Sequence, residues 1–329
     1  MNPVTMKWLL RREFWEHKGS MFWAQLVVGA VLVLFVGGSL VYGLAMHGAP
    51  GHMIVNGRTV SHGTLAAAMP PFMAAKVANI ASGMYLAAGA PLMLLMTATL
   101  FFYCLGALYD ERRDRSILFW KSLPVSDGMT VLSKVLTAAC VAPLITMAFA
   151  FAVSLALLLI GCAIMATGGV NMFGLVLSSP DLYLQPLRLA ALLPVYAIWA
   201  LPTIGWLLLV SSWAKTKPFL WAVGVPLMTI LLAKWISMAL GGFEHDALNV
   251  QWLANEVVGR ALGGLIPGIW FSFTGIPPEL HPTNDGVDMQ GLFAASWMTL
   301  ATAKAWIGAL IGAAMIFGAI RLRRWRDEG

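Results

Sequence analysis

The chain has 329 residues, of which 59% are hydrophobic and only 11% are charged, with 21 Lys or Arg and 15 Asp or Glu. Soluble domains carry roughly 25% charged residues, so this composition nearly excludes a soluble protein and indicates a surface that faces lipid. The three cysteines lie in apolar runs without a CxxC pair or a His at zinc-ligand spacing, which excludes a disulfide framework.

Six apolar segments are long enough to cross a bilayer core of about 30 Å, which takes about 20 helical residues. They predict an all-α integral membrane protein, with a single transmembrane domain over residues 1–329. The segments lie at residues 23–46, 83–108, 135–165, 189–212, 218–240 and 296–320. The first is too long for the apolar part of a signal peptide, which has about 7 to 15 residues. The third is long enough to tilt or to project from the bilayer, and Pro143 can kink it.

The distribution of basic residues predicts the orientation of these spans. Fifteen of the 21 lysines and arginines lie at the two termini or in the second and fourth connections, and six lie on the other face. Positively charged residues concentrate on the cytoplasmic side of membrane proteins, so both termini are predicted in the cytoplasm. The net charge of +6 is then a signal of topology, and nucleic-acid binding is not expected.

Two helical segments are predicted outside the spans. Residues 1–20 have the pattern of an amphipathic helix that lies flat on the inner leaflet. Residues 241–295, between the fifth and sixth spans, contain a helical pattern at 247–273 that is too short and too polar to cross the membrane. The apolar side of the first segment consists of Met6, Leu10 and Phe14, with Trp8, Leu9 and Trp15 beside them and Lys7, Arg11, Arg12 and Lys18 on other faces.

The chain lacks the local patterns of a membrane enzyme or an ATPase. Glu244-His245-Asp246 has no second His one turn later, as a zinc protease requires, and no Gly-x-Ser-x-Gly occurs. None of the lysines follows a glycine, so a P-loop is absent from the sequence and any ATP-driven role needs a separate subunit. Histidines in the first outer loop are compatible with a loose metal or proton site, although exposed loop histidines are the ordinary interpretation: His47, His52 and His62.

The second connection, residues 109–134, has the composition of a docking surface. Charges of both signs interleave at residues 110–115, and an apolar patch follows at 117–123. Aromatic and apolar side chains flanked by charge are typical of protein interfaces. The alternative is that the patch rests on lipid headgroups. Ser126 and Asp127 are placed to cap a helix that leads into the third span.

The layout and this connection resemble the permease subunits of ABC-2 type transporters, also called type V ABC exporters. Residues 111–117, Glu-Arg-Arg-Asp-Arg-Ser-Ile, lead to Ser-Leu-Pro-Val-Ser at 122–126 and to Lys134. This is similar to the family pattern of an acidic-basic pair, a small residue, an apolar run, a Leu-Pro motif and a Lys at the foot of the third span. The resemblance implies a coupling helix for an ATPase, with candidate coupling residues Glu111, Arg112, Arg115, Ile117, Phe119, Trp120, Leu123 and Pro124.

The resemblance also implies the other subunits of the transporter. A second permease, identical or related, and two ABC ATPase subunits would complete an exporter of the bacterial inner membrane. ATP and Mg²⁺ would bind to the ATPase partners, and this chain would hold no cofactor. The segment 247–273 would form short re-entrant or gate helices at the outer face. The substrate class expected is a lipid-like, peptide or amphipathic molecule.

Two lysines inside predicted spans are candidate substrate-pathway residues. Lys234 and Lys304 are both expected near the outer interface, where they could attract an anionic headgroup or a peptide carboxylate. The alternative is that they are snorkelling anchors. Glycines at spacings suited to close helix packing occur in the sixth span, at Gly308 and Gly312, and in the outer segment, at Gly259, Gly263 and Gly268. The alternative is that they arise by chance, since such patterns are common in apolar segments.

Two other functions stay open from the sequence. An ATP-independent secondary transporter or channel is disfavoured, because no Asp or Glu lies well inside any predicted span to couple an ion or proton. A membrane scaffold or regulatory subunit, whose connection binds another cytoplasmic protein, is not excluded by the sequence.

Overall fold

A computed structural model describes residues 3–47, 53–55, 58–60, 71–114, 125–167, 171–241, 249–278 and 288–325. Across these ranges the chain is helical apart from turns, short irregular connections and one short antiparallel hairpin, so the predicted all-α class is confirmed in outline. The hairpin pairs β1 (Met53–Val55) with β2 (Arg58–Val60).

Six helices in the described ranges are long and apolar enough to cross a membrane, which is compatible with a multi-pass membrane protein. The third has 41 residues and is about 60 Å long at 1.5 Å per residue, twice the thickness of a bilayer core. The sixth begins at Ala303, so the predicted start at residue 296 was wrong. The six are Gly19–Met46, Lys76–Arg113, Asp127–Thr167, Pro180–Trp213, Pro218–Ala239 and Ala303–Trp325.

In its described part, the first half of the chain contains three π-helical turns, η1, η2 and η4, and one 3₁₀ turn, η3, between α-helices. In chain order the elements are α1 (Pro3–Glu16), η1 (Gly19–Trp23), α2 (Ala24–Leu32), η2 (Val33–Gly37), α3 (Gly38–His47), α5 (Pro71–Met84), η3 (Tyr85–Gly89), α6 (Ala90–Gly106), α7 (Tyr109–Arg113), α9 (Asp127–Leu136), η4 (Thr137–Val141) and α10 (Ala142–Thr167).

The second half contains a π-helical turn, η5, within the segment between the fifth and sixth membrane-capable helices, and a 3₁₀ turn, η7, before the last helix. The elements are α11 (Phe173–Ser178), α12 (Pro180–Ala191), α13 (Leu193–Trp213), α14 (Pro218–Gly241), α15 (Val250–Trp252), η5 (Leu253–Gly259), α16 (Arg260–Gly263), α17 (Trp270–Thr274), α18 (Met289–Met298), η7 (Thr299–Ala301) and α19 (Ala303–Trp325).

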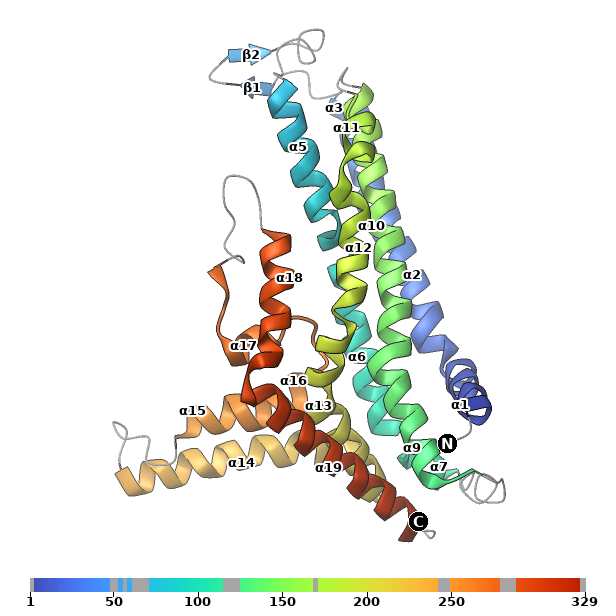
Figure 1. Ribbon diagram of the computed structural model, residues 1–329, viewed down its shortest axis with the longest axis vertical. Coiled ribbons are helices and arrows are strands. Elements are labelled where there is room, and N and C mark those ends of the chain that lie inside the picture. Colours follow the sequence, from blue (N-terminus) through green and yellow to red (C-terminus); the bar gives the residue numbers. More distant parts are fainter. Residues whose placement is uncertain are drawn as a thin grey trace.

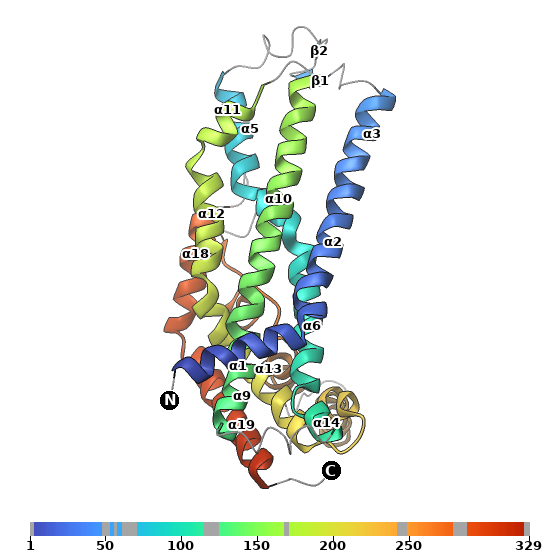
Figure 2. The same cartoon turned by 90° about the vertical axis from the view of Figure 1, so that its right-hand side faces the viewer.

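The long helices form a bundle along the longest axis of the molecule, as Figures 1 and 2 show. The bundle contains α2 and α3, α5 and α6, α10, and α11 and α12. Near one end, α1 crosses the bundle (Figure 2). At the same end, α14 and α15 run side by side across the long axis, and α19 runs obliquely beside α13 (Figure 1). The described ends of the chain both lie toward this end, as an even number of spans predicts.

Prolines coincide with irregular turns in two of the long helices. Pro143 follows the π-helical turn η4, and Pro91 follows the 3₁₀ turn η3. A proline removes one backbone donor, and a local change of helix type is a common adjustment. At η3 the helices also approach closely, because a Cβ built on Gly89 would lie 2.7 Å from the Cβ of Ala150.

The closest helix pair is α13 with α19, and it depends on glycine. A Cβ on Gly312 would lie 2.5 Å from the backbone carbon of Leu201, and a Cβ on Gly205 would lie 2.5 Å from the carbonyl oxygen of Gly312. A Cβ on Gly308 would lie 2.6 Å from the guanidinium of Arg260. The predicted close packing at Gly308 and Gly312 is therefore confirmed.

The same prediction was wrong for the glycines of the outer segment. Added Cβ atoms on Gly259 and Gly263 would make contacts no closer than 3.4 Å and 3.8 Å, which are near ordinary van der Waals distances. Gly268 has nothing within 4 Å of such an atom, and its φ of +86° assigns it to a turn instead.

Candidate functional site

Four charged side chains from four helices meet at the end of the bundle where α1 crosses it. Glu13 of α1, Glu111 of α7, Lys134 of α9 and Arg323 of α19 are each no more than 8% exposed. The ammonium nitrogen of Lys134 lies 2.9 Å from Glu13 Oε1 and 3.0 Å from Glu111 Oε1. Arg323 donates from Nη1 to Glu111 Oε2. These four residues, here called the ionic cluster, contain two positive and two negative charges.

Further hydrogen bonds complete the surroundings of the ionic cluster. The hydroxyl of Tyr103, from α6, donates to Glu13 Oε2 over 2.8 Å. Arg323 Nε donates to Asp127 Oδ1 over 3.0 Å, at the start of α9. Buried charges are tolerated when they are paired and hydrogen-bonded in this way, and removing one partner is costly. The cluster therefore joins α1, α6, α7, α9 and α19 through mutually dependent contacts.

The position of α1 follows from its inward side. Leu9 and Glu13, one turn apart, are its two buried residues, and Glu13 extends into the ionic cluster. Arg12 pairs with Glu16 over 2.7 Å and also lies 3.9 Å from Glu111. The inward side of α1 is therefore partly ionic, which its apolar pattern did not predict.

The outward side of α1 presents aromatic and basic residues together. The guanidinium of Arg11 lies 5.4 Å from the ring centre of Trp8, and the ammonium of Lys18 lies 5.1 Å from that of Trp15. Both tryptophans are exposed. Such pairs are typical of helices at a membrane surface. The predicted apolar stripe lies between the two sides and is only half-buried, at Met6, Leu10 and Phe14.

The first turn of the second connection is attached to the end of α13. Arg112 Nη2 donates to the carbonyl oxygens of Ser211 and Ala214, over 2.7 and 2.9 Å, where the last carbonyls of a helix lack helical partners. The Ser211 hydroxyl in turn accepts hydrogen bonds from the backbone N–H groups of Leu108 and Tyr109. The other candidate coupling residues lie outside the described residues: Arg115, Ile117, Phe119, Trp120, Leu123 and Pro124.

The far end of the second connection starts α9 with the predicted cap. Ser126 has an extended backbone, and its hydroxyl accepts a hydrogen bond from the N–H of Met129 over 3.3 Å. Asp127 lies in the first turn, where its charge favours the helix start and its carboxylate also binds Arg323. Both ends of the connection are thus held, one by Glu111 and Arg112 and the other by Ser126 and Asp127.

Replacing Ser126 by alanine is expected to destabilise the protein by about 1 kcal/mol, because the Met129 N–H loses the hydroxyl as an acceptor and keeps only the Ser126 carbonyl oxygen. Thermal unfolding of the purified protein in detergent measures this change. Ser126→Gly is the matched variant and should cost only a few tenths of a kcal/mol, since glycine is tolerated at this position. Equal losses for the two variants would contradict the capping role.

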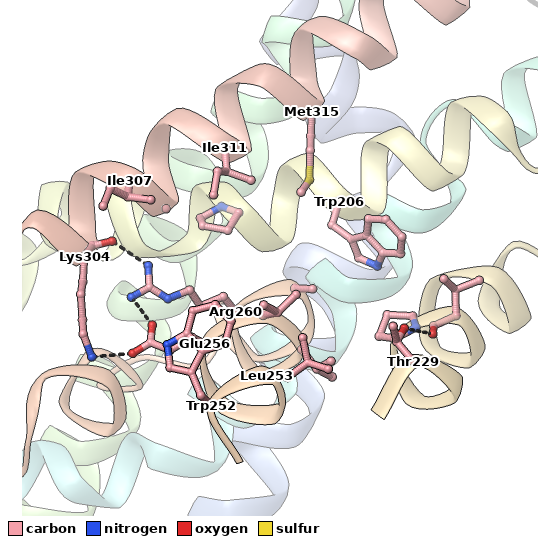
Figure 3. A pocket seen from close by; sticks show the side chains of 17 residues that line it. Trp206, Thr229, Trp252, Leu253, Glu256, Arg260, Lys304, Ile307, Ile311 and Met315 are labelled. Atoms are coloured by element: carbon pink, nitrogen blue, oxygen red, sulfur yellow. Dashed lines mark hydrogen bonds and ion pairs between the residues drawn. The ribbon is translucent and has the colours of Figure 1, made fainter. Parts of the chain in front are cut away.

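The structure separates the two lysines that the sequence placed together. Lys234 is exposed on α14 and does not line a described pocket. Lys304, at the start of α19, donates to Glu256 Oε1 and to the carbonyl oxygen of Phe273. Glu256 also pairs with Arg260, with 2.8 Å between Oε2 and Nη2. Figure 3 shows these three charged residues at one side of a cavity of about 450 Å³.

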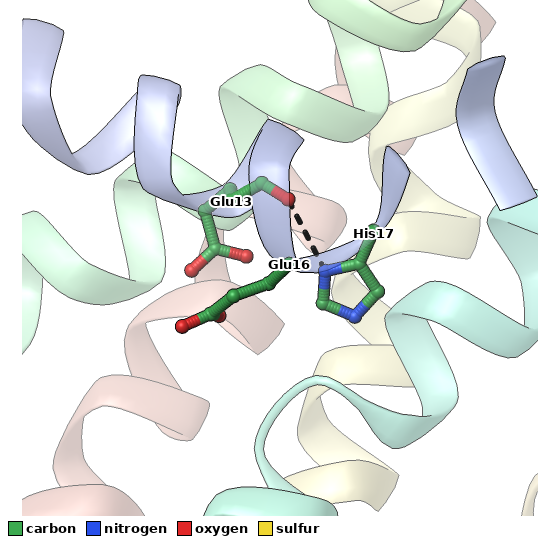
Figure 4. Close-up of side chains that lie close together, drawn as sticks. All are labelled: Glu13, Glu16 and His17. Carbon is green, nitrogen blue, oxygen red and sulfur yellow. Dashed lines mark hydrogen bonds between the residues drawn. The ribbon is translucent and has the colours of Figure 1, made fainter. Parts of the chain in front are cut away.

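A group of potential metal ligands occurs on α1 and just after it. Glu13, Glu16 and His17 each have a ligand atom within 4.8 Å of the others, as drawn in Figure 4. The carboxylate of Glu13 is already bound by Lys134 and Tyr103, and His17 Nδ1 lies 3.3 Å from the Glu13 carbonyl oxygen. These contacts give Glu13 a place in the ionic cluster and account for the group without an ion.

The sequence indicated two of the four residues of the ionic cluster. It singled out Glu111 and noted Lys134 at the foot of the third span, but it did not select Glu13 or Arg323. The available signal was an acidic residue within an otherwise basic, apolar helix, since Glu13 and Glu16 are the acidic residues of the first 20 positions. Nothing local to Arg323 distinguishes it from the neighbouring arginines of the last helix.

Comparison with known proteins does not identify a relative. No protein-family model matches the chain, and neither a curated protein nor a solved structure matches it significantly.

Proposed function

We propose that the chain is the membrane subunit of an ATP-driven exporter of the ABC-2 type, driven by a separate ATPase that docks on the second connection, residues 109–134. The observation that carries the proposal is the ionic cluster, because it lies where this connection leaves and re-enters the helices. The resemblance of residues 111–126 and Lys134 to the family pattern supplies the class of partner.

Motion of the second connection would pass to several helices at once. Glu111 lies at the end of the second membrane-capable helix, and Lys134 lies near the start of the third. Arg323 of the last helix bonds Glu111 and Asp127, and Glu13 of α1 bonds Lys134. Separating any of these pairs would remove a charge-assisted contact inside a buried network, so the helices favour moving together.

The complete machine in this proposal contains two permease chains, identical or related, and two ATPase subunits that bind ATP and Mg²⁺. It lies in the bacterial inner membrane with both termini in the cytoplasm. The helix α1 rests on the inner leaflet through its exposed tryptophan and basic residues. The cargo is lipid-like, peptide or amphipathic.

The charge distribution favours this class over an ion-coupled transporter. Among the described residues, the acidic side chains of the six membrane-capable helices lie within the terminal turns: Asp110, Glu111, Asp127 and Asp181. A proton or ion relay needs acidic groups along the pathway. A transporter that receives its energy from a partner at the end of the bundle requires no acidic groups along the pathway.

Co-purification tests the proposal directly. A nucleotide-binding protein should be recovered with the full-length chain from its native membrane, and Phe119, Trp120 and Leu123 replaced together by serine should reduce its recovery at least tenfold. The reason is that apolar and aromatic residues supply most of the binding energy of such interfaces, about 2 kcal/mol or more each at the strongest positions. Quantitative mass spectrometry of the purified material measures the ratio of partner to chain.

Trp325→Ser is the matched control, because this tryptophan is 78% exposed and lies outside the second connection. It should leave recovery of the partner unchanged. Recovery of the chain alone, with transport intact in vesicles that lack ATP, would refute the proposal. Recovery of a partner that does not bind nucleotide would instead identify the chain as a scaffold.

A further inference from the structure

The cavity in Figure 3 is bounded by four parts of the fold: α13, α14, the segment from α15 to α16, and α19. Its volume of about 450 Å³ lies in the range of small-molecule sites, roughly 300 to 1,000 Å³. Away from the charged residues its walls are mainly apolar, as expected of helices long enough to cross a membrane. These wall residues include Trp206, Val225, Pro226, Leu253, Ile311 and Met315.

One end of the cavity carries a net positive charge. Arg260 and Lys304 share a single carboxylate, that of Glu256, so the three residues sum to +1. The side chains of Arg260 and Glu256 are largely buried, at 11% and 15% exposure. Arg260 Nε is buried and has no hydrogen-bond acceptor among the described residues. An excess charge in such surroundings favours binding of an anion.

The position of Arg260 is fixed by its neighbours. Its guanidinium carbon lies 5.2 Å from the ring centre of Trp199 and 5.0 Å from that of Phe273, and its Nη1 donates to the Lys304 carbonyl oxygen over 2.6 Å. Lys304 differs, because its side chain is 53% exposed and therefore can reach a group at the mouth of the cavity. A fixed guanidinium beside a flexible ammonium suits a phosphate or carboxylate headgroup.

We infer that this cavity binds an anionic lipid, with the headgroup at Arg260 and Lys304 and one acyl chain along the apolar wall. Figure 3 shows the charged residues for the headgroup at one side of the cavity and the apolar residues for the acyl chain, Trp206 and Met315, at the other. The inference goes beyond the proposed function, since the site requires no ATPase. A second arrangement, a free phosphate ion at the charged end, would not use the apolar wall.

Native mass spectrometry of the full chain in a zwitterionic detergent tests the site, with phosphatidylglycerol as the probe and phosphatidylcholine of the same acyl chains as the comparison. Lys304→Gln should weaken binding of phosphatidylglycerol about fivefold, and Glu256→Gln should strengthen it by a similar factor, since each removes one charge near the headgroup. Lys234→Gln is the matched control and should change nothing, because this exposed lysine does not line the cavity.

Ile311→Trp, which fills the apolar part, should remove the saturable binding of phosphatidylglycerol. Glycerol phosphate, which carries the charge without acyl chains, should fail to compete. Lys304→Gln is expected to weaken binding of phosphatidylglycerol and Glu256→Gln to strengthen it. Misfolding cannot explain both results, because a misfolded variant cannot bind the lipid more tightly. The inference is overturned if Lys304→Gln and Lys234→Gln behave alike, if Glu256→Gln does not strengthen binding, or if glycerol phosphate competes fully.

Discussion

Replacing Lys134 by methionine is expected to lower the free energy of unfolding by about 3 to 5 kcal/mol, the usual cost of leaving a buried charge without its partner. Lys134 is 2% exposed and bonds both Glu13 and Glu111, so the variant leaves the ionic cluster with a net charge of −1. Tyr103 and Arg323 keep one contact each to these carboxylates but cannot balance that charge.

Unfolding of this variant in detergent can be followed with a thiol-reactive dye, because Cys104 and Cys162 are buried and react only when the helices separate. Lys234→Met is the matched control, since that lysine is exposed, and it should unfold like the parent protein. Adding Glu13→Gln to Lys134→Met restores electrical neutrality and should recover part of the loss. Equal stability of Lys134→Met and Lys234→Met would contradict the stabilising role of Lys134 in the ionic cluster.

The second large effect is expected at Gly312, where alanine should lower the free energy of unfolding by about 1 to 3 kcal/mol through overpacking. The added Cβ would lie 2.5 Å from the backbone carbon of Leu201 and 2.7 Å from the nitrogen of Pro202. Backbone atoms cannot rotate away as a side chain can, so α13 and α19 would have to move apart. The same thiol-reactive dye measures the change.

Gly161→Ala provides a control of opposite sign. Gly161 lies inside α10 with nothing within 4 Å of a Cβ, and alanine favours a helix over glycine by about 1 kcal/mol. This variant should therefore unfold at the same or a higher temperature than the parent protein. If Gly312→Ala shifts unfolding no more than Gly161→Ala does, the close contact of α13 and α19 does not exist as described.

Properties carried by local sequence could be predicted. The six membrane-capable helices follow from long apolar runs, the helix cap from Ser126 and the close packing of α19 from Gly308 and Gly312. In each case the physical cause lies within a few neighbouring residues: apolar transfer energy over one segment, a hydroxyl near a free N–H, or a small residue on one helical side.

The predicted start of the last span was wrong because the helix break before Ala303 is not visible in the hydropathy of the sequence. Residues 296–302 continue the apolar run, but the hydroxyls of Ser296, Thr299 and Thr302 each donate to a carbonyl oxygen three or four residues earlier. Such bonds compete with helical ones, and Thr302 adopts an extended conformation that separates η7 from α19. Lys304 therefore stands at a helix start instead of inside a span.

The candidate site itself could be predicted only in part. Glu111 and Lys134 lie near the second connection, whose composition drew attention to it. Glu13 and Arg323 join it only through tertiary packing between the first and last helices, for which one sequence offers no signal. Lys234 and Lys304 have similar apolar neighbours in sequence, and only the fold brings one of them to Glu256.

The contact between Arg323 and Glu111 also has a consequence for biogenesis. A ribosome makes Glu13, Glu111 and Lys134 well before it makes Arg323, so the nascent chain first holds two carboxylates with one ammonium. That intermediate carries an uncompensated negative charge which the last helix neutralises on arrival. Completion of the final helix thus adds the second buried positive charge, and in a chain that stops before position 323 Glu13 and Glu111 share the single ammonium of Lys134.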